Sequence, residues 1–117
     1  MENLKAVAIF PKILPENLEQ FKSIAQEMLL NISKQDSVLS YEMYFTLDNS
    51  SCVVIEEYKT PEGVIEHVKT NSALLDKLTR LGGAIQGSMF PRSQQGEAIQ
   101  EIRNNWDSKM HVYFDGK

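Results

Sequence analysis

The sequence is poor in cysteine, in basic residues and in long apolar runs. Its single cysteine, Cys52, cannot form an internal disulfide, which agrees with a reducing compartment. No apolar run approaches the ~20 residues needed to cross a bilayer, and the segment that begins at Met1 does not resemble a signal peptide. We therefore expect a cytoplasmic protein with no membrane partner.

The charge pattern also excludes a class of partner. Twelve basic residues are scattered among 16 acidic ones, for a net charge of -4. Nucleic acid binding needs a clustered basic face, which this sequence does not offer, so we expect no nucleic acid partner.

The length fits one domain. The chain has 117 residues, of which 42% are hydrophobic, and this supports one core but not two. There is no sequence repeat and no linker long enough to divide the chain. We expect a single domain over residues 1–117, with a core at about 4–90 and a C-terminal extension at 91–117.

The hydrophobic period changes along the chain and predicts its elements. Residues 4–10 are short and apolar and are followed by Pro11, which favours a strand, whereas apolar spacings of three and four over 16–32 predict a helix. Alternation over 38–46 and 52–58, with a turn between, predicts a hairpin whose first strand has Leu39, Tyr41, Met43 and Phe45 on one face. The later elements expected are helices at 61–70 and 74–81, a strand at 84–90, a helix at 95–106 and a strand at 110–114.

This order is that of the split βαβ, ferredoxin-like fold. The fold is α+β, with an antiparallel sheet and helices on one face, here followed by an extra helix and strand. Apolar residues on both sides of the hairpin strands indicate that the second face is covered too. The expected cover for so short a chain is a second copy, which gives a homodimer packed sheet on sheet, a dimeric α+β barrel.

Two segments carry a resemblance to a known family. They are LSYEMY at 39–44 and VIEEYKTPEGVIEH at 54–67, and the match extends over roughly residues 4–81. The order of strand, glutamate, aromatic residue, cap and helical histidine resembles the antibiotic biosynthesis monooxygenase (ABM) domains, which are dimeric α+β barrels. The resemblance implies an oxygenase of aromatic polyketides or quinols that uses no metal or flavin, so no cofactor is expected.

His67 is the first candidate for chemistry. On the helix at 61–70 it shares a face with Gly63 and Asn71, one turn away on either side. A neutral imidazole could accept the proton of a phenol before the substrate reduces dioxygen, and Asn71 could orient the substrate. The alternative is a structural histidine, hydrogen-bonded to the backbone or to Glu56.

Four further residues are candidates for substrate binding. Tyr41 and Tyr58 offer aromatic walls with a polar tip, Met43 could line an irregular pocket, and Glu56 would need a partner if buried. Core packing, a dimer interface or an architectural ion pair would explain the same residues. Cys52 and the two histidines lack the spacing of metal ligands, so no metal site is expected.

Three functions are compatible with these residues. The first is a cofactor-independent monooxygenase acting on a small hydroxylated aromatic compound, such as a quinol or a polyketide-like molecule. The second is a ligand-binding or stress-associated barrel that holds a small aromatic or apolar molecule without turnover. The third is haem degradation. Haem-degrading members of the family that this sequence resembles carry an asparagine on the first strand and a tryptophan and a histidine on the second helical region. That function is disfavoured here, because the first strand has no asparagine beyond Asn3 at its edge and the only tryptophan, Trp106, lies in the tail.

Overall fold

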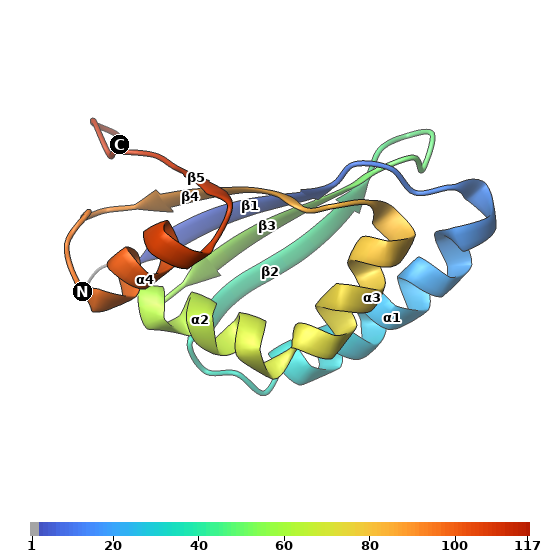
Figure 1. Cartoon of the computed structure of the whole chain (residues 1–117), viewed down its shortest axis with the longest axis horizontal. Helices are drawn as coiled ribbons and strands as arrows, with labels where there is room; N and C mark the ends of the chain where they lie inside the picture. The colour runs from blue at the N-terminus through green and yellow to red at the C-terminus, as the bar shows by residue number, and fades with distance from the viewer. Residues whose placement is uncertain (1–2) are drawn as a thin grey trace.

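The computed structural model describes residues 3–117 and contains one five-stranded sheet with helices on one face (Figure 1). The strands are β1 (Leu4–Phe10), β2 (Val38–Phe45), β3 (Cys52–Tyr58), β4 (Gln86–Pro91) and β5 (Ser108–Met110). The helices are a 3-10 turn η1 (Pro15–Asn17), α1 (Leu18–Ile32), α2 (Pro61–Thr70), α3 (Ser72–Gly82) and α4 (Glu97–Asn105). Within residues 3–117 no helix is both long and apolar enough to span a membrane.

The predicted fold class is confirmed. The strand order is β2-β3-β1-β4-β5, and the first four strands pair antiparallel. This is the ferredoxin-like arrangement of an α+β fold. The extension adds α4 and then β5, which pairs with β4 in parallel at the sheet edge.

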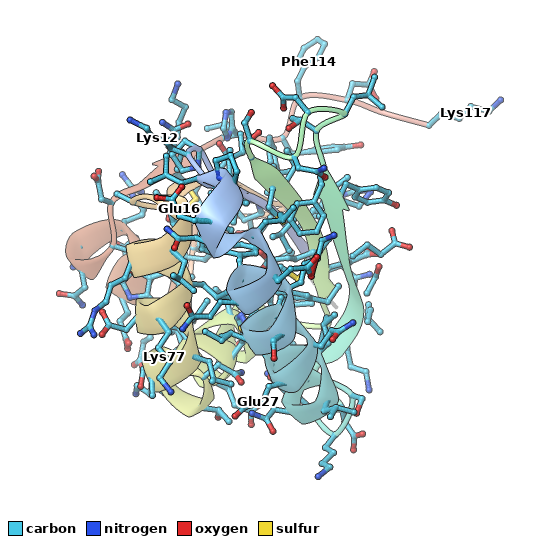
Figure 2. All side chains as sticks on the ribbon, turned by 90° about the vertical axis from the view of Figure 1, so that its right-hand side faces the viewer. Lys12, Glu16, Glu27, Lys77, Phe114 and Lys117 are labelled. Atoms are coloured by element: carbon cyan, nitrogen blue, oxygen red, sulfur yellow. The ribbon has the colours of Figure 1, made fainter. Side chains whose placement is uncertain are left out.

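The C-terminal strand differs from its prediction. β5 covers Ser108–Met110 instead of 110–114, and the last backbone hydrogen bond to the sheet runs from His111 N to Met89 O at 3.0 Å. Beyond it Phe114 is 96% exposed and projects from the molecule (Figure 2). The apolar alternation over 110–114 therefore does not form the predicted strand, because the parallel pairing with β4 ends at Met89 and Met110.

A β-bulge changes the face of one predicted residue. Val38 pairs with Tyr58, but Ser40 already pairs with Glu57, so Leu39 is an extra residue in β2. Leu39 is consequently 49% exposed, and the prediction that it shares a face with Tyr41 was wrong. Without the bulge, side chains would alternate regularly along β2, and Leu39 would lie on the same face as Tyr41.

The core lies between the sheet and the helices and has two parts. The first packs under α1 and α3 and includes Phe10 and Phe21, whose ring centroids are 5.1 Å apart in an edge-to-face pair. The second packs under α2 and α4 and includes Leu4, Tyr58 and Ile102, all fully buried. Figure 2 shows the polar side of α1 and α3, opposite the core, where the labelled residues Glu27 and Lys77 point outward.

Within residues 3–117, no helix covers the second face of the sheet (Figure 1). Tyr44 is 51% exposed there, and Ile55, in the central part of this face, is 47% exposed. The expected homodimer would cover this face, and it remains a prediction.

Candidate functional site

A cavity of about 370 Å³ lies where the two parts of the core meet. Its floor is the sheet, and its walls come from α2, α3 and the segment that joins α4 to β5. Small-molecule sites in proteins are of this size and are mostly apolar with a few polar groups. The principal apolar side chains around it are Ala6, Val64, Val68, Leu75, Met89 and Trp106.

Glu56 brings a carboxyl group to the cavity from the centre of the sheet. The alternation of β3 turns Glu56 and Tyr58 toward the helices and Glu57 away from them. Glu56 is 7% exposed, and the Tyr58 hydroxyl donates a hydrogen bond to its Oε1 at 2.5 Å. Burial raises the pKa of Glu56 to about 7, although the bond from Tyr58 acts in the opposite direction.

Tyr41 lies next to the Glu56 carboxyl, on the neighbouring strand β2. It pairs with Glu56 in the β2–β3 register, and its ring centroid lies 5.1 Å from that of His67. Burial, and then the charge of Glu56, raise the pKa of Tyr41. Its hydroxyl therefore stays protonated near neutral pH and can donate a hydrogen bond.

His67 enters from α2 and is held by Asn71, one helical turn later. The Asn71 amide nitrogen Nδ2 lies 3.1 Å from His67 Nδ1 and 3.0 Å from the His67 backbone oxygen. Asn31 of α1 donates to Asn71 Oδ1 at 3.4 Å. Burial lowers the pKa of His67 to about 4, so the imidazole is neutral at pH 7.

The structure brings together three of the six predicted site residues, places two others directly behind them and places the sixth, Met43, away from the cavity. Tyr41, Glu56 and His67 line the cavity. Tyr58 is fully buried behind Glu56, and Asn71 lies behind His67. Met43 packs against the part of the core under α1 and α3 and is not a lining residue.

The sequence did not reveal the wall formed by Trp106, Asp107 and Ser108. Helix α4 ends at Asn105, and Trp106 has an extended backbone that leads into β5. The available signal was the apolar spacing that ends at Trp106, which we assigned to the helix itself. The parallel pairing of β5 with β4 carries this segment to the cavity.

Two further observations concern Cys52 and the residue types that bind metals. Cys52 is fully buried, and burial raises the pKa of its thiol to about 11, so the thiol stays protonated near neutral pH. Among residues 3–117, no three histidine, cysteine, aspartate or glutamate residues are grouped closely enough to hold a metal ion.

Comparison with solved structures shows a shared fold at low sequence identity. MupZ from Pseudomonas fluorescens superposes with a TM-score of 0.81 at 14% identity, covering 99% of this chain and 93% of MupZ. A structure described as an antibiotic biosynthesis monooxygenase has a TM-score of 0.65 at 18% identity, covering 80% of this chain and 99% of its own. Rv0793 from Mycobacterium tuberculosis has a TM-score of 0.67 at 17% identity, covering 82% of this chain and 98% of its own.

These neighbours identify the fold as that of the ABM domains, as the sequence predicted. The match to MupZ covers nearly the whole chain and so includes most of the C-terminal extension, whereas the other two leave about a fifth uncovered. No protein-family model matches the sequence, and the search of curated proteins also finds no significant match.

Proposed function

We propose that the protein is a cofactor-independent monooxygenase that oxidises a small hydroxylated aromatic compound in this cavity. The observation that carries the proposal is the meeting of Glu56, His67 and Tyr41 in an apolar cavity of about 370 Å³. The shared fold with an antibiotic biosynthesis monooxygenase supports the same class of reaction.

The chemistry needs no electron donor besides the substrate. A phenol with hydrogen at the para carbon takes one oxygen atom from dioxygen and becomes a quinone, while the second oxygen atom leaves as water. The phenol supplies all four electrons, and losing its hydroxyl proton makes it a much better donor. The protein must therefore remove a proton, stabilise a phenolate oxygen and keep water away from reduced oxygen intermediates.

The residues of the cavity meet these needs. A carboxyl and an imidazole are available for proton transfer and hydrogen bonding, Tyr41 adds a hydroxyl donor, and Trp106 offers an aromatic surface for a flat ring. The apolar side chains of α2 and α3, Val64, Val68 and Leu75, give water no hydrogen-bond partner along that wall.

The test is a panel of phenols, naphthols and anthrones incubated with the protein under ¹⁸O₂. We expect oxygen uptake and one labelled oxygen atom in the quinone, measured by mass spectrometry, with an anaerobic incubation and Glu56→Gln as controls. Trp106 is the only tryptophan, so its fluorescence reports ligand binding in the same samples. If many of the tested compounds quenched the Trp106 fluorescence in a saturable way but caused no oxygen uptake, the protein would instead be identified as a binding protein.

Haem degradation is tested separately. Because Trp106 lines the cavity, its position in the tail no longer argues against haem. The first strand still lines the cavity with apolar residues such as Ala6 and Ala8 and contributes no asparagine to it. We expect no Soret shift when haem is added to the protein.

A further inference from the structure

We propose that Glu56, and not His67, accepts the substrate proton, and that Asn71 holds His67 in the tautomer whose Nε2–H donates a hydrogen bond into the cavity. This inference rests on the proposed function and assigns the roles within that site.

The first step is the orientation of the Asn71 amide. Its Nδ2 lies 3.0 Å from the backbone oxygen of His67. A carbonyl oxygen only accepts hydrogen bonds, so the amide must present its nitrogen and not its oxygen to this carbonyl. The amide oxygen then faces Asn31, whose Nδ2 donates to it at 3.4 Å. The contact with the His67 carbonyl therefore fixes the orientation, and the contact with Asn31 agrees with it.

The second step is the tautomer of His67. The oriented Nδ2 also lies 3.1 Å from Nδ1 of the imidazole, so Nδ1 faces a donor and must accept. A neutral imidazole carries one N–H, which is then on Nε2. A proton added to Nδ1 would point at the N–H of Asn71. The geometry thus makes the ring a hydrogen-bond donor toward the cavity and disfavours its protonation.

The third step is the accessibility of the Glu56 carboxyl. Oε1 accepts from Tyr58 at 2.5 Å, and within residues 3–117 the protein offers Oε2 no hydrogen-bond partner. Every buried side-chain nitrogen or oxygen in this part of the chain does have a partner. Oε2 is therefore not sealed in the core, and since Glu56 lines the cavity, it is open to a ligand there.

The surrounding titratable groups leave Glu56 as the proton acceptor. Tyr41 on β2 and Tyr58 on β3 have raised pKa values and stay protonated, and His67 on α2 stays neutral. Asp107, at the end of the cavity formed by the extension, is exposed. The pKa of Glu56, about 7, is well suited to general base catalysis at neutral pH.

The proton transfer then has defined partners. The O–H bond of the bound phenol breaks, its proton moves to Oε2 of Glu56, and the electron pair stays on the phenolate oxygen. The Nε2–H of His67 and the hydroxyl of Tyr41 are the donors available to stabilise that oxygen. In this assignment Asn71 is a positioning residue, because it acts only through His67.

The tautomer can be measured without any substrate. We expect two-dimensional ¹⁵N NMR of the ¹⁵N-histidine-labelled protein to show His67 as the Nε2–H tautomer from about pH 6 to 8. The sequence contains one other histidine, His111, and His111→Gln assigns the signals. An Nδ1–H tautomer, or protonation of His67 near pH 6.5, would overturn the proposal.

The proton acceptor is identified by the pH profile of kcat/KM. In the native protein we expect kcat/KM to rise with pH around a midpoint near 7. In Glu56→Gln we expect kcat/KM to be roughly 10²- to 10⁴-fold lower and to show no such midpoint. His67→Gln should lower activity but keep the midpoint. Glu57→Gln is the matched control, because the adjacent carboxylate faces the other side of the sheet. A midpoint that persists in Glu56→Gln contradicts the assignment.

Failure of the proposed function would be recognised separately. If no phenol is oxidised, the inference can still be tested by following the ¹³C NMR signal of the Glu56 carboxyl as the pH changes. The variant Glu56→Gln assigns this signal. A midpoint near 7 together with the Nε2–H tautomer would support the assigned protonation states and refute only the monooxygenase reaction. A midpoint below about 5, close to an ordinary glutamate, would overturn the inference.

Discussion

The hydroxyl of Tyr58 donates to Oε1 of Glu56 at 2.5 Å, and both side chains face the helices because they lie two residues apart on β3. This bond favours the ionised carboxylate, whereas burial favours the neutral acid. Their balance keeps the pKa of Glu56 near neutral pH.

Replacing Tyr58 by Phe should raise the pKa of Glu56. The ring is retained but the donor is lost, so we expect the ¹³C midpoint of the carboxyl to rise by about one pH unit. Tyr44→Phe is the control, because Tyr44 is half-exposed and bonds to Glu42 instead. An unchanged midpoint in Tyr58→Phe would show that this bond does not stabilise the charge.

The free energy of unfolding should contain two opposing dependences on pH. The pKa of Glu56 is raised from 4.5 to about 7, so its contribution to stability is present below pH 4.5 and is lost as the pH rises to 7. The pKa of His67 is lowered from 6.5 to about 4, so its contribution is present above pH 6.5 and is lost as the pH falls to 4. Each amounts to about 3 kcal/mol, and between pH 4.5 and 6.5 they cancel.

Single variants should separate these contributions. Compared with the native protein, Glu56→Gln should gain stability as the pH rises from about 4.5 to 6.5, and His67→Gln should lose it. Urea unfolding followed by circular dichroism at pH 4.5, 5.5 and 6.5 measures the difference. In Glu57→Gln, the free energy of unfolding should depend on pH as it does in the native protein. If the free energy of unfolding of all three variants depended on pH as it does in the native protein, neither buried group would have a shifted pKa.

Gly82→Ala should destabilise the contact between α3 and the core. A Cβ at this position would lie 2.8 Å from Phe21 Cε2 and 3.0 Å from Phe10 Cβ, and both rings are buried. We expect a loss of about 1–3 kcal/mol in the free energy of unfolding, measured with urea. Gly116→Ala, whose nearest neighbour would be the Tyr113 hydroxyl at 3.4 Å, should change little. Equal stability of the two variants would contradict this account.

The uncovered sheet face leads us to propose a homodimer. Ile55, 47% exposed, pairs with Val7 of β1 and Glu42 of β2 on that face. Light scattering should give twice the chain mass of 13.3 kDa for the native protein and the mass of one chain for Ile55→Lys. Leu30→Lys, on the exposed side of α1, is the control and should remain dimeric. A well-folded native monomer at micromolar concentration would refute the proposal.

Local patterns allowed the fold to be predicted, because helices and hairpins bury residues at a fixed period. The face shared by His67 and Asn71 followed from helical spacing alone, and one of the adjacent residues Glu56 and Glu57 had to face the helices. The register was needed to decide which, since it sets Glu56 opposite Tyr41 and Ala6.

Features that depend on distant partners could not be predicted in the same way. The bulge at Leu39 is visible only in the pairing of β2 with β3. The position of Trp106 depends on the pairing of Ser108 with Gly87, which lies across a long connection in the sequence. The tautomer of His67 also depends on Asn31, 40 residues before Asn71.

The strand β5 is only three residues long, and it holds the segment Trp106–Ser108 against the cavity. The four strands of the ferredoxin-like order pair with one another and do not use β5. Insertions or substitutions in β5 and in the segment before it can therefore change the shape of the cavity, while strands β2 and β3, which carry Tyr41 and Glu56, stay the same.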